Sequence, residues 1–125
     1  MQLSDTADMS LLSTKELIGK IRPALIARSS KDGKPNVSAK GSFRVLDKEH
    51  VLFADMSSPR TIANLRENPQ VSIICLDPAS RKGCRIWGKA RILESGGLFD
   101  SMAAEFAPRK VKHVITVFVE EAMVF

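Results

Sequence analysis

The stretch ALIARSSKDGKPNVSA, residues 24–39, has the pattern of a β-hairpin and is the first sign of an antiparallel β fold. Its two apolar-rich ends flank a polar turn with Asp32-Gly33, and this pair supplies the positive φ that a tight hairpin turn needs. The next residues repeat the pattern around the polar turn Asp47-Lys48-Glu49. Short turns join neighbouring strands antiparallel. The two hairpins predict four antiparallel strands, at residues 24–29, 36–39, 43–46 and 51–54.

Further along the chain, the patterns predict three more strands and three helices. The apolar run VSIICL and the strictly alternating stretch CRIWGKARIL are typical of strands. Ser13 and Glu16 form a capping box, Pro59 suits a first helical position, and Pro108 ends a helix. Strands are expected at residues 71–76, 84–93 and 113–119. Helices are expected at residues 13–21, 59–68 and 96–106.

Six or seven antiparallel strands of this length tend to close into a barrel, because closure removes exposed sheet edges. We therefore predict a mainly β chain, a small antiparallel barrel with short helices at its ends. A length of 125 residues fits one domain, which is expected to take in residues 1–125. Residues 1–11 carry no periodic pattern and are expected to form a loose N-terminal arm.

Composition and charge narrow the classes of function. A chain that is 44% hydrophobic and 26% charged is typical of a globular protein, which excludes disorder and coiled coil. No apolar run reaches the roughly 18 residues of a membrane span and no leader opens the chain, so a cytoplasmic protein without membrane contact is expected. Two cysteines without metal-ligand spacing predict no disulfide scaffold and no metal site. The net charge of +5, concentrated in residues 28–44 and 81–91, favours anionic partners such as nucleotides, phosphates or nucleic acid.

The clearest candidate site is the segment Ser57-Ser58-Pro59-Arg60-Thr61 at an expected helix start. A helix N-terminus presents free N–H groups and the positive end of the helix dipole. Arg60 can bind a phosphate through two parallel hydrogen bonds, and the hydroxyls of Ser58 and Thr61 can donate further ones. The alternative interpretation is that Ser58 only caps the helix and Arg60 is a solvated surface residue.

Two other residues stand out, each with an ordinary alternative. Lys40 ends a strand among small residues that would let a flat ligand lie against the backbone, but it can also be an exposed strand-end charge. Trp87 lies between Arg85 and Lys89 on a strand, which is typical of a base-stacking platform, a subunit interface or a partly buried tryptophan. His50 and His113 are isolated in the sequence and are assigned no catalytic role.

Several segments, taken in order, resemble a known family. They are PNVSAKGSF at residues 35–43, Phe53-Ala54-Asp55, SPRTIANL at residues 58–65 with Asn68-Pro69, the strand of residues 83–93, and VITV at residues 114–117. In this order and spacing the chain resembles the FMN-binding split-barrel proteins of the pyridoxamine-phosphate-oxidase-like superfamily, and most of all the small bacterial FMN-binding proteins. The resemblance runs from about Leu12 to the last strand.

This resemblance implies a homodimer of split β-barrels with one FMN per subunit at the dimer interface. Residues 38–41 would lie beside the flavin ring, where Lys40 would stabilise the anionic reduced form, and residues 54–55 would flank the ribityl chain. The phosphate would be held at the helix start, and two residues would approach from the partner subunit. The implied cofactor-binding residues are Ser38, Ala39, Lys40, Gly41, Ala54, Asp55, Ser57, Ser58, Arg60, Thr61 and, from the partner, Arg85 and Trp87.

The sequence also departs from true pyridoxamine-phosphate oxidases. It ends at Phe125, without the segment that carries their Arg and His substrate contacts, and Thr61 stands where they have a lysine. Oxidation of pyridoxamine phosphate is therefore not expected. The leading hypothesis is an FMN-dependent oxidoreductase of unknown substrate, with a small-molecule electron donor or acceptor.

Other hypotheses remain open at this point. The second is a non-enzymatic FMN electron carrier, and the third is a small basic nucleic-acid-binding barrel. Against the third stand the absence of tyrosine and the single tryptophan. Related split barrels also hold heme or a deazaflavin in place of FMN.

Overall fold

The computed structural model describes Ile18 and residues 23–125. The predicted N-terminal arm and the helix predicted at residues 13–21 lie outside the described residues, except for Ile18, which is buried in the core. The order of the remaining predicted elements is confirmed. The strands are β1 (Ala24–Ser29), β2 (Pro35–Lys40), β3 (Arg44–Val45), β4 (His50–Asp55), β5 (Gln70–Leu76), β6 (Gly83–Leu93) and β7 (His113–Val124). The helices are α2 (Pro59–Glu67) and α3 (Gly97–Phe106).

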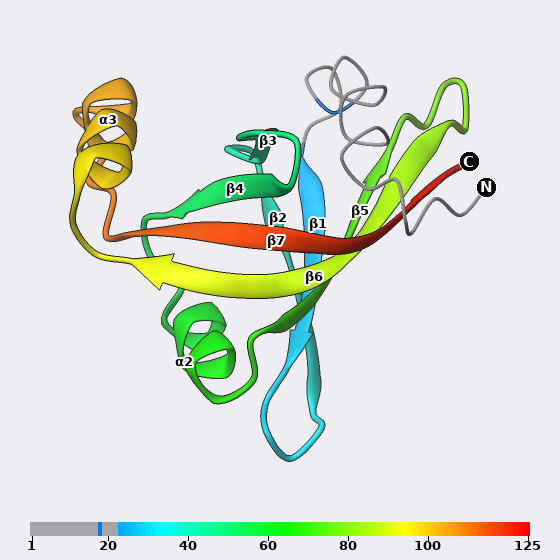
Figure 1. The fold of residues 1–125 in the computed structure, drawn as a ribbon, viewed down its shortest axis with the longest axis horizontal. Coiled ribbons are helices and arrows are strands. Elements are labelled where there is room, and N and C mark those ends of the chain that lie inside the picture. Colours follow the sequence, from blue (N-terminus) through cyan, green and yellow to red (C-terminus); the bar gives the residue numbers. More distant parts are fainter. Residues whose placement is uncertain (1–17, 19–22) are drawn as a thin grey trace.

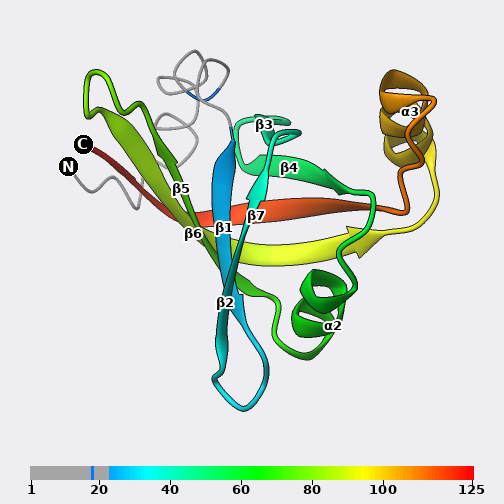
Figure 2. The same ribbon diagram turned by 180° about the vertical axis from the view of Figure 1, so that it is seen from behind.

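The seven strands form one antiparallel sheet in the order β2-β1-β5-β6-β7-β4-β3. The long strands β6 and β7 run across β1 and β2 at a steep angle in both ribbon views, because the sheet twists and curls (Figures 1 and 2). The two edge strands, β2 and β3, are consecutive in the chain and are separated only by residues 41–43. The predicted mainly β architecture is therefore confirmed as a split half-barrel with short helices at its ends.

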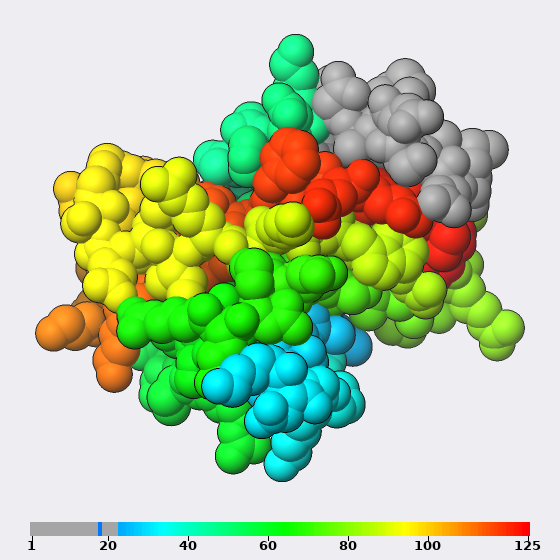
Figure 3. Space-filling view, turned by 60° about the horizontal axis from the view of Figure 1, so that its bottom comes forward, coloured from blue at the N-terminus to red at the C-terminus, as the bar shows by residue number. Residues whose placement is uncertain are grey.

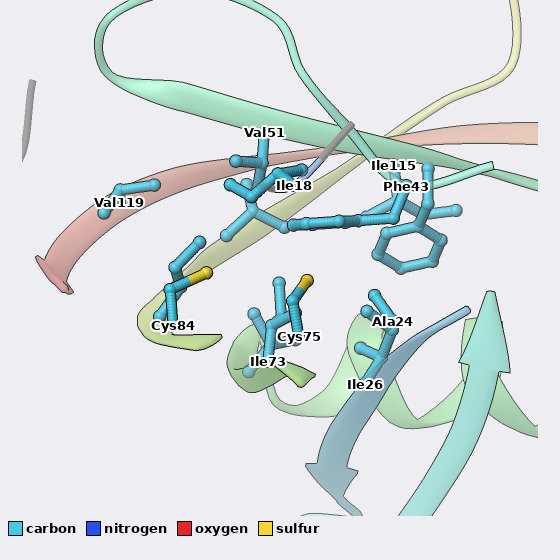
Figure 4. Close-up of a cluster of buried hydrophobic side chains, with 14 of the residues drawn as sticks. Ile18, Ala24, Ile26, Phe43, Val51, Ile73, Cys75, Cys84, Ile115 and Val119 are labelled. Atoms are coloured by element: carbon cyan, nitrogen blue, oxygen red, sulfur yellow. The ribbon is translucent and has the colours of Figure 1, made fainter. Parts of the chain in front are cut away.

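The core lies inside the curl of the sheet and is built from the inward side chains of alternating strand positions. Phe53, Ile73 and Ile115 are at most 1% exposed, and Figure 4 shows the side chains of this cluster converging from several strands. Ile62 and Leu65 of α2 pack against the same cluster. A second, smaller cluster holds α3 against β4 and β7 through Met102 and its neighbours. These contacts hold both helices against the sheet, which determines the position of the candidate site.

Some boundaries differ from those predicted. The strand expected at residues 43–46 contains only Arg44–Val45, because Phe43 is buried ahead of it and Leu46 is already in the turn. The last strand continues five residues past Val119, since after pairing with β4 it goes on along β6 to Val124. The alternation of β6 is interrupted by a register shift between Trp87 and Gly88. In the part of the chain that is described, no helix combines the length and apolar character needed to span a bilayer.

The register shift gives a first testable prediction. A Cβ atom on Gly88 would collide with the backbone carbonyl oxygen of Phe118 and lie 2.8 Å from Cγ1 of Val117. Gly88→Ala should therefore lower the free energy of unfolding by about 1–3 kcal/mol, the usual cost of overpacking. Gly97→Ala is the matched control, because no atom lies within 4 Å of its added Cβ. Urea denaturation of both variants measures the effect, and equal stabilities would contradict the close packing of β6 on β7.

Candidate functional site

The start of helix α2 leaves backbone N–H groups without acceptors. Pro59 is the first helical residue, and the first intrahelical bond runs from the N–H of Ile62 to the carbonyl oxygen of Ser58, at 3.2 Å. The N–H groups of Arg60 and Thr61 therefore have no acceptor within the helix. The Ser58 side chain makes no capping bond, so the structure does not support the interpretation of Ser58 as a side-chain cap. This helix start keeps its capacity to bind an anion.

Lys40, at the end of β2, is joined to this helix start. Its Nζ donates a hydrogen bond of 2.6 Å to the Ser58 hydroxyl oxygen. Burial lowers the pKa of Lys40 from its usual value, the negative charge of Asp55 opposes this, and the positive charge of Arg28 adds to it. The end of β2 and the start of α2, which are separate candidate sites in the sequence, are thus in direct contact.

A cavity of about 420 Å³ opens beside this contact. We refer to it as the main cavity, and its volume lies in the usual range for small-molecule sites. Six predicted site residues line it: Ala39, Lys40, Gly41, Ala54, Ser57 and Ser58. Four lining residues were not predicted: Ser42, Met56, Phe106 and Arg109. Phe106 and Arg109 come from the end of α3 and the segment after it, and no local motif marks them.

The wall of the main cavity is held by polar contacts between elements. The N–H of Ala54 donates to the Ser42 hydroxyl oxygen at 2.8 Å, which ties the β2–β3 connection to β4. The Arg44 guanidinium makes two hydrogen bonds to the Glu105 carboxylate, at 2.8 and 2.6 Å, and lies 5.7 Å from the Phe106 ring centre. The end of α3 is thereby fixed at the cavity.

Asp55 contacts His113, a histidine for which the sequence predicts no catalytic role. Asp55 is 1% exposed, and its Oδ2 lies 2.8 Å from Nδ1 of His113. The other ring nitrogen of His113 is 3.6 Å from Oε1 of Glu94, and Oδ1 of Asp55 has no hydrogen-bond partner among the described residues. Asp55 and His113, with Ser57 and Ser58, border a second cavity of about 380 Å³. Since 58 residues separate the pair, no local pattern could have found it.

Arg28 on β1 is a further residue that was not predicted, because in the sequence it is only one charge of a basic stretch. Its side chain points inward and the residue is 7% exposed. Nη1 donates to the Ser38 hydroxyl at 2.9 Å and to the carbonyl oxygen of Ile26 at 3.3 Å. Burial lowers the pKa of Arg28, and the positive charge of Arg60 lowers it further. Ser38, a predicted site residue, thus contacts Arg28 and does not line the main cavity.

The remaining predicted site residues do not come together at one place in the chain's fold. Arg60 is exposed at the helix start, whereas Thr61 is 1% exposed and packed on the buried side of α2. Arg85 and Trp87 lie on β6, with the guanidinium carbon 5.7 Å from the tryptophan ring centre. Trp87 borders a third cavity and not the main one. A single chain therefore does not bring Arg85 and Trp87 to the Lys40–Ser58 contact.

The chain matches one protein family over most of its length. That family is described as pyridoxamine 5'-phosphate oxidase, and the match covers residues 13–122. The uncharacterized protein MJ0282 of Methanocaldococcus jannaschii is 41% identical over 64 residues, which are 48% of this chain and 43% of that protein. The chain thus spans less than half the length of this relative.

Solved structures share the fold at lower identity. HupZ of Group A Streptococcus is similar with a TM-score of 0.84 at 24% identity, over 91% of this chain and 92% of that chain. An FMN-binding protein from Syntrophomonas wolfei reaches 0.82 at 14% identity, over 94% and 87% of the two chains. HutZ, the heme storage protein from Vibrio cholerae, reaches 0.64 at 21% identity, over 91% and 92%. With the seven-stranded half-barrel and the family match over residues 13–122, the chain belongs to the pyridoxamine 5'-phosphate oxidase-like split-barrel family.

Proposed function

We propose that this protein is an FMN-binding flavoprotein that acts as an oxidoreductase in the form of a homodimer. The observation that carries the proposal is the hydrogen bond from Lys40 to Ser58 at the uncapped start of α2, directly beside the main cavity. An ammonium group, a hydroxyl and free backbone N–H groups form a donor set that suits a phosphate monoester. Arg60 follows in the same turn and adds a second positive charge.

The main cavity also suits the rest of the cofactor. Ala39, Gly41 and Ala54 have small side chains, so they leave room for a flat ring against the backbone. Bound FMN would supply hydride or single-electron transfer, and the protein would bind and orient it. The ammonium group of Lys40 lies at the same cavity, where it would bind the phosphate beside Ser58.

A homodimer would account for Arg85 and Trp87, which do not border the main cavity of their own chain. Leu25 and Val37 are 44% and 63% exposed, and both lie on the outer face of the sheet, where Ala39 stands opposite Leu25. Exposed apolar patches of this kind mark protein–protein interfaces. In a dimer built on this face, Arg85 and Trp87 of one subunit would approach the flavin of the other.

The third hypothesis, nucleic-acid binding, receives less support from the geometry. It relied on an open positive surface formed by two basic stretches, residues 28–44 and 81–91, and on Trp87 as a stacking residue. Instead Arg28 is buried, Lys40 bonds to Ser58, and Arg44 pairs with Glu105. Within residues 28–44 only Lys31 and Lys34 are exposed, which favours a phosphate-bearing small molecule over a phosphate backbone there, while the basic residues of 81–91 are largely exposed.

The proposal is tested by loading the purified protein with FMN, removing free ligand by desalting, and recording the absorption spectrum, with hemin treated in parallel. We expect flavin bands at close to one FMN per subunit and no retained hemin. Retention of hemin without FMN would contradict the proposal. Turnover of the loaded protein with NADH or NADPH then separates the oxidoreductase from the electron carrier, which would accept electrons without catalysing steady consumption.

A further inference from the structure

Arg28 carries a buried positive charge that no negative group among the described residues pairs with. Within residue 18 and residues 23–125, its hydrogen-bond acceptors are the Ser38 hydroxyl and the Ile26 carbonyl oxygen, both uncharged. Its Nε is buried and has no partner. A buried charge without a counter-charge is costly, and buried arginines normally pair with carboxylates. The described structure thus contains an arginine that is prepared for an anion from outside the chain.

The charged groups that influence Arg28 are also positive. Arg60, at the start of α2, and Lys40, at the end of β2, both interact unfavourably with its charge. We call Arg28, Lys40 and Arg60 the cation cluster. Its members come from β1, β2 and α2, which lie next to one another, and Figure 3 shows the α2 segment against the β1–β2 hairpin.

Side-chain contacts bind these three elements into one polar surface. Asn36 of β2 donates to Asn64 of α2 at 3.3 Å, and Lys40 of β2 donates to Ser58 at 2.6 Å. Between these two positions on β2 stands Ser38, which accepts the hydrogen bond from Arg28. Nη1 of Arg28 therefore lies on the same inner side of β2 as Lys40, and the charge of Arg60 at the helix start is close enough to affect its pKa, although Arg28 borders the third cavity and not the main one.

We propose that Arg28 binds a phosphate monoester group from the sheet side, opposite the start of α2, and makes the site selective for phosphorylated ligands. This inference rests on the proposed function for the identity of the ligand, which is then the phosphate of FMN. A dianionic phosphate provides the negative charge that Arg28 lacks among the described residues, and it can accept hydrogen bonds from Arg28 and from the helix start together. Riboflavin, which has the same ring without the phosphate, gains nothing from Arg28.

The test compares the Arg28→Met variant with the unchanged protein by flavin fluorescence titration and thermal unfolding. We expect the dissociation constant for FMN to rise at least about tenfold, the loss of one charge-assisted hydrogen bond. The dissociation constant for riboflavin should change less than about twofold. The ligand-free variant should unfold at the same or a higher temperature, because an uncompensated buried charge has been removed. Arg91→Met, at an exposed residue of β6, is the matched control.

A purely structural role for Arg28, as a tie between β1 and β2, gives the opposite pattern. The ligand-free variant would then unfold at a lower temperature, and FMN and riboflavin would lose affinity equally, which would overturn the proposal. Arg28→Lys should recover part of the FMN affinity, because it restores the charge without the planar fork.

If the proposed FMN binding is wrong, the same measurements give a different result from the one expected for a purely structural Arg28. If the unchanged protein bound neither flavin, inorganic phosphate would be tested as the ligand. A rise in unfolding temperature with phosphate that is lost in Arg28→Met would support the anion site and reject FMN. No phosphate effect in either protein would reject both.

Discussion

Replacing Lys40 and Arg60 together by alanine is expected to raise the dissociation constant for FMN by about two to four orders of magnitude. Each side chain is expected to make one charge-assisted hydrogen bond to the phosphate, and such bonds contribute roughly 1.5–3 kcal/mol each. The double variant should therefore lose about 3–6 kcal/mol of binding free energy, and about 1.4 kcal/mol corresponds to a factor of ten. The hydrogen bond from Lys40 to Ser58 would be lost with it.

Fluorescence titration with FMN measures this effect. A double variant of Lys48→Ala and Lys82→Ala removes the same net charge at two exposed positions that do not border the main cavity. This control should bind FMN within a few-fold of the unchanged protein. An unchanged affinity in the Lys40 and Arg60 variant would rule out the start of α2 as the phosphate site.

The substitution Val37→Asp is expected to convert a dimer into a monomer and to abolish retention of FMN. Val37 is 63% exposed and lies on the outer face of the sheet, where Leu25 is also exposed. In the proposed dimer this face is covered, and a carboxylate buried there without a partner would cost several kcal/mol. Because Arg85 and Trp87 are expected to reach the flavin across the interface, the monomer would hold only part of the site.

Light scattering coupled to gel filtration gives the mass, and the absorption spectrum after desalting gives the flavin content. Leu46→Asp, at an apolar side chain that is 39% exposed in the β3–β4 turn, is the matched control and should leave both unchanged. A Val37→Asp monomer that keeps one FMN per chain would show that the site is complete within one subunit.

Features encoded by neighbouring residues could be predicted from the sequence. The Asp32-Gly33 turn, where Gly33 has a φ of +86°, produced the first hairpin, and Pro59 marked the first residue of α2. The helix predicted at residues 96–106 begins one residue later and ends at Phe106 as expected. In each case the backbone preference of one residue type acts within a few positions.

Features that depend on the curl of the sheet could not be predicted. The contact of Asp55 with His113 and the pairing of Arg44 with Glu105 join residues 58 and 61 positions apart. They form only because β4 pairs with β7 and because α3 packs on β4 and β7. The burial of Arg28 likewise arises when β2 and α2 close over its inward side, although its sequence context is that of a surface charge.

The candidate site combines features encoded by neighbouring residues with features that depend on the curl of the sheet. The sequence analysis named the helix start and Lys40 as separate candidates, and the structure joins them through a hydrogen bond of 2.6 Å. Phe106 and Arg109 complete the main cavity from a segment about fifty residues downstream of the helix start, a placement that only the packing of α3 on β4 and β7 determines. Local chemistry thus predicts the ligand class, and the fold determines which residues would surround the ligand.

The central claim is that FMN binds with its phosphate at the start of α2 and its ring along β2. A crystal structure of the protein loaded with FMN tests this most directly. We expect phosphate oxygens within hydrogen-bond distance of Ser58 and Arg60, and the ring against residues 38–41 at an interface between two subunits. A phosphate elsewhere on the surface, or a ring bound away from β2, would contradict it.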